Sequence, residues 1–343
     1  VAQHGTSKAM AHDGNTSVYV VDRFTMAFGG THEQLDGTYA QVADNPLSAN
    51  GKSLKWTTGT AESSYDADEY LYLAQKIEAQ NLQSINNGNS NAVPITLSFY
   101  VKSSVTGTFA VGIYKEDSTT RIFNKTYAIS SANQWEKKSV TFVGDTSGGG
   151  IVNDNGAGFW INWHLAAGST YTGGGATSGW SDYANDKWAD GQATNAIATT
   201  SGATWQLAQC QLEIGEVATA LQHEDFGTTL AKCQRYFTRV PTIDASTAYA
   251  FIAAGMATDT TASIFPISYP VTMRANPSLA TSGSMRVYNG GGVNPTAGIT
   301  LNSVSNYSAS VNVPTGAVFT TKDATLVGLN NDVDAHFTFD AEL

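Results

Sequence analysis

The sequence predicts an all-β protein built from a large antiparallel jelly-roll sandwich, a short linking helix and a smaller C-terminal β-sandwich. Short apolar segments with a period of two recur along the chain and are separated by turns rich in Gly, Asn and Asp. No helical pattern of about 10–15 residues lies between them, as it would in a parallel α/β fold. Only 14% of the 343 residues are charged and 41% are hydrophobic, enough for two cores.

Four segments follow from these patterns. Residues 1–17 are polar and lack periodicity, which predicts an extended N-terminal arm. The jelly roll is expected over 18–225, the linker helix over 226–240 and the second sandwich over 241–343. The last of the seven Trp residues is Trp205, so an aromatic ligand site is expected in the jelly roll.

The predicted jelly-roll strands have the close spacing typical of a sandwich. They cover residues 19–26, 39–42, 52–57, 70–77, 95–102, 108–114, 126–129, 135–142, 159–165 and 205–214. The strands over 95–102 and 108–114 are joined by five residues and are expected to form a hairpin. Residues 166–203 form a long Gly-rich stretch without periodicity, which is expected to act in binding or at an interface.

The junction between the domains changes period. After Gly227, residues Leu230, Cys233 and Phe237 fall at helical spacing, which predicts a helix over 229–238. The two cysteines, Cys210 and Cys233, fit either a disulfide or two reduced thiols, and the thiols are favoured. The second sandwich is expected to have about six strands, over 248–256, 263–271, 285–288, 308–313, 326–329 and 335–340.

Several segments together resemble a known class of proteins. They are SLKW, YLYLAQKIEAQNLQ, ITLSFYVKSSVTGTFAVGIY, ANQWEKKSVTFVGDTSGG, the GSTYTGG loop, the junction WQLAQCQLEIGEVATALQHEDFGTTLAKCQRYF and, near the end, PVTMRANP and HFTFDAEL. In their order and spacing, these segments resemble virion structural proteins of tailed bacteriophages, of the marine phage type. Such proteins, among them tail and head fibre proteins, carry a carbohydrate-binding-like jelly roll. The resemblance covers roughly residues 18–238, with a further likeness in the second sandwich.

The resemblance implies a biological setting for the chain. It implies location in the virion, a homotrimeric appendage, and contacts with other virion proteins of the capsid or tail. It also implies attachment to a host-surface glycan. A capsid decoration or tail-assembly subunit that binds no sugar is the alternative within the same setting.

Aromatic residues in and near the long loop are the candidates for glycan binding: Trp160, Trp180, Tyr183 and Trp188. Indole and phenol rings stack on the C–H faces of sugar rings, and nearby polar groups bind the hydroxyls. In the segment 159–164, alternate residues point to opposite faces, so one set is expected in the core. The alternative is that most of these aromatic residues pack in the sandwich or at a subunit interface.

Two groups of acids fit oxygen ligation of calcium. Asp66, Asp68 and Glu69 lie within four residues, and Asp145 with Asp154 is a second group. Neither has EF-hand spacing, and solvated turn carboxylates are the favoured interpretation of both. No other cofactor is expected.

No enzyme activity is expected, because the chain lacks a Gly-x-Ser-x-Gly elbow, a HExxH pair, a phosphate-binding loop and a dinucleotide fingerprint. A glycan depolymerase stays open as an alternative, since the separation of a carboxylate pair is a three-dimensional property. Its candidates are Glu33, Glu62, Glu69 and Asp182. The net charge of -11 argues against nucleic acid and anionic membranes as partners. The longest apolar run, 248–257, is too short for membrane insertion.

Overall fold

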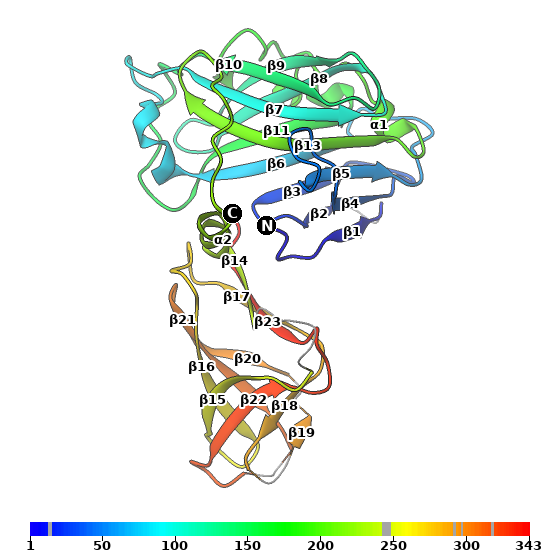
Figure 1. The fold of residues 1–343 in the computed structure, drawn as a ribbon. Coiled ribbons are helices and arrows are strands. Elements are labelled where there is room, and N and C mark those ends of the chain that lie inside the picture. The colour runs from blue at the N-terminus through cyan, green and yellow to red at the C-terminus, as the bar shows by residue number, and fades with distance from the viewer. Residues whose placement is uncertain (13–15, 242–247, 291–292, 296–297, 317–318) are drawn as a thin grey trace. The chain divides into compact units, whose positions relative to one another are not determined.

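The protein is described by a computed structural model that covers residues 1–12, 16–241, 248–290, 293–295, 298–316 and 319–343 (Figure 1). Contacts divide the chain into two units, one formed by Ala2–His223 with Leu343 and the other by Glu224–Glu342 with Val1. The change from one unit to the other at residues 223 and 224 lies close to the boundary predicted after residue 225. No helix in the described ranges is long and apolar enough to cross a membrane.

The first unit consists of two antiparallel sheets. The six-stranded sheet has the order β1 (Ser7–Met10), β4 (Gly37–Val42), β5 (Ser53–Thr58), β13 (Thr204–Ile214), β7 (Ile95–Ser103) and β10 (Glu136–Phe142). The seven-stranded sheet has the order β12 (Ser181–Asp182), β9 (Arg121–Ile129), β8 (Gly107–Lys115), β11 (Ala157–Ala167), β6 (Tyr70–Glu78), β3 (Phe24–Gly29) and β2 (Thr16–Tyr19). The predicted all-β class and jelly-roll sandwich are therefore confirmed.

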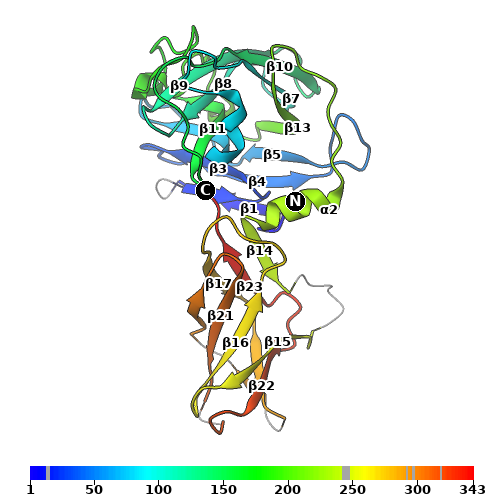
Figure 2. The same cartoon turned by 90° about the vertical axis from the view of Figure 1, so that its left-hand side faces the viewer.

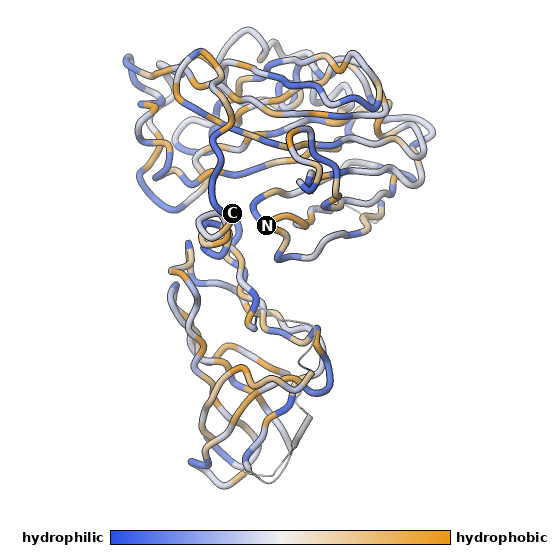
Figure 3. Tube along the Cα trace, in the orientation of Figure 1, coloured by the Kyte–Doolittle hydropathy of each residue, from blue (hydrophilic) through white to orange (hydrophobic). Residues whose placement is uncertain are grey.

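One hydrophobic core lies between these two sheets. Trp56, Phe99 and Trp205 from the six-stranded sheet belong to the same buried cluster as Phe109 and Trp163 from the seven-stranded sheet. A shared core means that the sheets pack face to face, each burying the apolar side of its alternating pattern. Hydrophobic residues accordingly recur along the strands of the unit (Figure 3).

The prediction of an extended N-terminal arm separate from the jelly roll is wrong for the described residues of 1–17; residues 13–15 lie outside them. Residues 7–10 form β1, which pairs with β4, and Met10 is buried in the jelly-roll core. The single strand predicted over 19–26 is also two strands: β2 and β3 pair with each other around a turn in which Arg23 has φ 72°. A short strand with few apolar residues gives little periodicity. The strand conformation of residues 7–10 therefore depends on pairing with a neighbouring strand rather than on a local pattern.

The predicted hairpin between 95–102 and 108–114 is also wrong, although both strands exist. β7 pairs with β10 and β13, whereas β8 pairs with β9 and β11 in the other sheet. The short connection between them therefore crosses from one layer of the sandwich to the other. Local alternation predicts that each segment is a strand, whereas the strand that it pairs with depends on the long-range packing of the two sheets.

The second unit is a smaller β-sandwich, also seen in Figure 2. A three-stranded sheet has the order β14 (Phe237–Val240), β23 (His336–Asp340) and β17 (Ser278–Ser282). A seven-stranded sheet has the order β19 (Val293–Pro295), β18 (Met285–Tyr288), β22 (Ala324–Leu329), β15 (Phe251–Ala257), β16 (Ala262–Ser268), β21 (Ser308–Pro314) and β20 (Thr300–Val304). Phe337 and Phe339 of the first sheet share a core with Phe265, Val311 and Val327 of the second.

The linking helix is shorter than predicted. α2 spans Phe226–Gln234 and begins at Asp225, whose side chain accepts a hydrogen bond from the Thr228 backbone at 2.9 Å. Residues 237–240, which were predicted as helix, form β14 and pair with β23. The aromatic and β-branched residues of this segment favour a strand once a partner is available. Both cysteines are reduced thiols, as favoured from composition.

Candidate functional site

Three neighbouring strands in the seven-stranded sheet of the first unit place polar and aromatic side chains in rows. Across β6, β11 and β8, the register aligns Lys76, Trp160 and Tyr114. Two residues further along β11, the residue opposite position 162 on β6 is an alanine and the one on β8 is a glycine. Tyr72 lies opposite His164 in the next row. Small residues in the middle row leave room between two rows that carry large rings.

The other face of β11 belongs to the core. Phe159, Ile161 and Trp163 are at most 1% exposed and lie in the jelly-roll cluster. The expectation that one alternate set of the segment 159–164 is core is therefore confirmed. Trp160 and His164 point to the opposite face of the sheet.

The long loop after β11 completes a groove on this face. It carries the short 3-10 helices η2 (Ser169–Tyr171) and η3 (Asn185–Lys187) and contributes Tyr171, Tyr183 and Trp188. The resulting cavity has a volume of about 340 Å³ and is lined by Tyr70, Tyr72, Tyr114, Trp160, Tyr171, Tyr183, Asn185 and Trp188. Seven of these eight residues are aromatic, and no carboxylate is among them.

Trp188 is the centre of the aromatic group. Its ring makes edge-to-face contacts, with centroids 5.4–6.3 Å apart, with Tyr72, Tyr114, Trp160, His164 and Tyr183. Edge-to-face packing of this kind is favourable for each pair and restrains the rings. The aromatic surface of the groove is therefore held in place by the rings themselves.

Polar contacts fix the edges of the groove. Trp160 donates from Nε1 to Glu116 at 2.7 Å, and the Lys76 ammonium lies 3.9 Å from the Trp160 ring centroid. The Tyr183 hydroxyl donates to Asn185 Oδ1 at 3.1 Å. These contacts orient the rings and leave hydroxyl and amide groups available beside apolar faces. Such a surface is suited to a ligand with both apolar and hydroxyl groups.

The floor of the groove is uncharged at neutral pH. His164 is fully buried, and burial lowers its pKa to about 3. The imidazole therefore stays neutral, and it acts as packing beneath Trp188 rather than as a charge for a ligand.

This buried histidine predicts a pH effect on stability. Between pH 6.5 and about 3 the unfolded chain binds a proton at His164 that the folded chain does not. The free energy of unfolding should therefore fall with falling pH, by about 1.4 kcal/mol per pH unit from this residue. Urea unfolding followed by Trp fluorescence reports the jelly roll, which holds all seven Trp. The difference between pH 7.5 and pH 5 should be smaller in His164→Gln, and an equal difference in both proteins would contradict the assignment.

The structure brings three of the four predicted glycan-binding residues together. Trp160, Tyr183 and Trp188 line the groove, whereas Trp180 does not. The Trp180 ring packs on Phe123 and Phe159 of the core, and its Nε1 donates to a backbone carbonyl oxygen at 2.7 Å. Five groove residues are not among those predicted from the sequence: Tyr70, Tyr72, Tyr114, Tyr171 and Asn185. The alternation of tyrosines in β6 was the signal that could have found the first two.

The first group of acids considered for calcium does not gather around a common point. Asp66, Asp68 and Glu69 do not form a group with ligand atoms within 4.8 Å of one another. Asp66 is exposed, whereas Glu69 is only 1% exposed. The chain turns between them, so adjacent carboxylates point to different surroundings.

The two acids of the second group, Asp145 and Asp154, each bind a different partner. Asp145 accepts two hydrogen bonds from Arg121, at 2.9 Å from Nε and 3.2 Å from a terminal nitrogen. The same guanidinium donates to Asp182 at 2.7 Å and so ties down the segment next to Tyr183. Asp154 accepts a hydrogen bond from the Gly156 backbone at 2.8 Å. Asp145 is thus a partner of an arginine.

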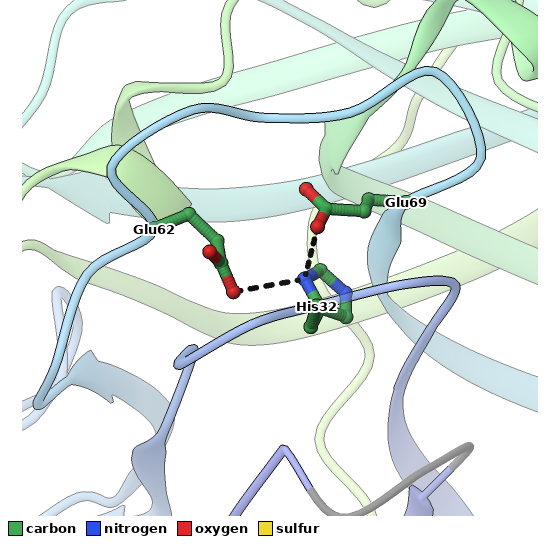
Figure 4. Close-up of side chains that lie close together, drawn as sticks. All are labelled: His32, Glu62 and Glu69. Carbon is green, nitrogen blue, oxygen red and sulfur yellow. Dashed lines mark ion pairs between the residues drawn. The ribbon is translucent and has the colours of Figure 1, made fainter.

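A different group, of one histidine and two glutamates, converges beside the start of β6. His32 lies between β3 and β4, Glu62 lies between β5 and β6, and Glu69 directly precedes β6. Figure 4 shows their three side chains pointing toward one another. His32 Nδ1 is 3.5 Å from a Glu62 oxygen and 3.4 Å from a Glu69 oxygen. Burial lowers the pKa of His32 and raises the pKa of Glu69 to about 7.

Comparisons with known proteins give structural similarities only. No protein-family model matches the sequence, and the search of curated proteins finds no match. A xylan-binding domain from Paenibacillus barcinonensis is 11% identical, with a TM-score of 0.31, over 60% of this chain and 91% of that domain. A family 11 carbohydrate-binding module from Clostridium thermocellum is 13% identical, with a TM-score of 0.30, over 62% of this chain and 98% of that module. The enzymatically active domain of a tailspike protein of bacteriophage CBA120 is 11% identical, with a TM-score of 0.29, over 62% of this chain and 20% of that protein.

Proposed function

We propose that the jelly roll is a non-enzymatic glycan-binding module and that the groove on β6, β8 and β11 is its binding site. The observation that carries this proposal is the lining of seven aromatic residues and one asparagine around about 340 Å³. Sugar rings present C–H faces to aromatic rings and hydroxyl groups to amides and phenols. The volume lies at the lower end of the range for ligand sites, which favours a short stretch of a glycan.

The character of the lining also favours a neutral sugar. The buried His164 is uncharged, and the lining has no Asp, Glu or Arg. Lys76 is near the groove, but its ammonium lies over the Trp160 ring. The eight lining residues themselves give no fixed charge for sulfate or carboxylate groups, so neutral hexose or pentose units are the proposed ligands.

The proposed setting is an appendage of a tailed phage, and it rests on the sequence resemblance. In that setting the chain is a subunit of a homotrimer that contacts other virion proteins and attaches the particle to a host-surface glycan. Contacts of single grooves are weak in this type of site. Three copies raise the effective affinity without new contacts, because the second and third binding events become intramolecular.

A glycan screen tests the proposed function. The purified protein should bind a subset of neutral oligosaccharides and bacterial surface polysaccharides on an array, and it should release no reducing ends from the polysaccharides that it binds. A folded protein that binds nothing on such an array would favour the decoration or assembly subunit. Release of reducing ends would favour the depolymerase, and substitution of candidate carboxylates would then identify the catalytic pair.

A further inference from the structure

The group His32, Glu62 and Glu69 has the arrangement of a metal site. Among the residues that the structure describes, it is the one group of three such side chains whose ligand atoms all lie within 4.8 Å of one another. The three side chains are only 1–2% exposed. His32 Nδ1 has no hydrogen-bond partner, although it faces two carboxylates. A buried nitrogen of this kind needs an explanation.

The other ring nitrogen of His32 indicates which tautomer is present. Nε2 faces the carbonyl oxygen of Tyr70 at 3.4 Å, so a proton on Nε2 is directed at that carbonyl. The lone pair of Nδ1 then points at the two glutamates. A histidine that binds a metal through one nitrogen usually donates from the other to a carbonyl or carboxylate in this way. Three electron-pair donors facing one another out of water are stabilised by a cation.

Backbone groups hold the two carboxylates in place. Glu62 Oε1 accepts from the Leu35 backbone at 2.7 Å, and Glu69 Oε2 accepts from the Asp66 backbone at 2.9 Å. The connections that carry the cluster also approach closely at Gly30, which has φ 105° and has no room for a Cβ atom, because one would lie 2.3 Å from the Asp68 carbonyl oxygen. The donors are therefore fixed by the local fold, before any ion is bound.

We propose that His32, Glu62 and Glu69 bind one divalent transition-metal ion of the zinc type. Zn–N and Zn–O bonds of about 2.0–2.2 Å place neighbouring ligands of a tetrahedral ion about 3.3–3.6 Å apart. The two distances from Nδ1 to the carboxylates, 3.5 Å and 3.4 Å, fall in this range. Calcium takes about six to eight oxygen ligands at longer distances, which a set of one imidazole and two carboxylates does not supply.

The position of the site gives the ion a structural role. It joins the connection between β3 and β4 to the connection between β5 and β6. Glu69 is followed directly by Tyr70, which lines the aromatic groove. The ion therefore stabilises the jelly roll and fixes the start of the strand that carries Tyr70 and Tyr72. The proposal does not depend on which ligand the groove binds.

Metal titration of the full chain, purified without a histidine tag and treated with EDTA, tests the site. Isothermal titration with zinc chloride should show one ion per chain, and excess zinc should raise the melting temperature of the jelly roll by about 5–10 °C. Glu62→Gln and Glu69→Gln should each weaken zinc binding by at least about 100-fold. Glu33→Gln, a matched change at an exposed neighbour of His32, should leave it unchanged.

Several results would overturn the proposal. They are no zinc binding by the folded wild-type chain, equal binding by the two glutamine variants, and binding of calcium in preference to zinc. The absence of zinc binding would mean that a shared proton, and not a metal ion, stabilises the three groups. If the variants fail to fold, the visible spectrum of the cobalt-loaded wild-type chain tests the proposal instead. The strong absorption of a four-coordinate site would support the proposal, and the much weaker absorption of a six-coordinate site would overturn it.

Discussion

Trp163→Ala is expected to lower the free energy of unfolding of the jelly roll by about 3–5 kcal/mol. The Trp163 side chain is completely buried, and its ring lies 5.9 Å from that of Phe99 in the opposite sheet and 6.2 Å from that of Phe24. Alanine would remove these contacts and leave a cavity where the two sheets meet. Urea unfolding followed by the fluorescence of the remaining Trp residues measures the change.

A matched substitution distinguishes core packing from the loss of any tryptophan. Trp135 lies just before β10, is partly exposed, and donates from Nε1 to Asp44 at 3.0 Å. Trp135→Ala should cost less than half as much as Trp163→Ala, since it leaves no enclosed cavity. Trp163→Phe should also be mild, because the Nε1 group that it removes has no hydrogen-bond partner. Equal losses in all three variants would contradict the position of Trp163 at the centre of the core.

Most strands of the jelly roll could be predicted because their signal is local. The strands observed over residues 70–78, 95–103 and 204–214 begin and end within one residue of the predicted ones. Each has alternation or an apolar run bounded by turn residues. The pairing of strands could not be predicted in the same way. β7 and β8 are close in sequence, but they lie in different sheets, and the alternation within each strand carries no information about which sheet it joins.

Two short segments, residues 7–10 and 237–240, could not be predicted from local patterns either. Residues 7–10 carry little periodicity, and they become a strand because the edge of β4 offers hydrogen-bond partners. Residues 237–240 continue a helical pattern in the sequence, but β23 gives their backbone a partner as a strand. In both places a long-range pairing outweighs a weak local preference.

The candidate site was predictable where the sequence itself concentrates aromatic residues. Trp160, Tyr183 and Trp188 stand out because they lie in or beside a loop without periodicity. Tyr72 and Tyr114 join them only through the register of β6, β11 and β8, which the sequence does not contain. The group of His32, Glu62 and Glu69 is harder still to predict, since His32 and Glu62 are thirty residues apart without a ligand spacing that a motif describes.

The groove and the cluster are connected through β6. The carboxylate of Glu69 belongs to the cluster, and the next side chain, Tyr70, belongs to the groove. The carbonyl of Tyr70 also faces the ring of His32. A chain treated with EDTA should therefore bind its glycan more weakly than the zinc-loaded chain if both proposals hold, whereas the groove alone predicts no effect of metal.

Trp188→Ala is expected to weaken glycan binding by at least about tenfold, or about 1.4 kcal/mol. Trp188 contacts four other groove rings, so its loss removes one stacking surface and frees the rings that it restrains. Isothermal titration with the best ligand from the array measures the change. Trp180→Ala should alter stability more than affinity, because Trp180 packs on the core outside the groove. Unchanged affinity in a folded Trp188→Ala protein would contradict this groove as the binding site, and a loss in Trp180→Ala alone would move the site to the edge of the sandwich.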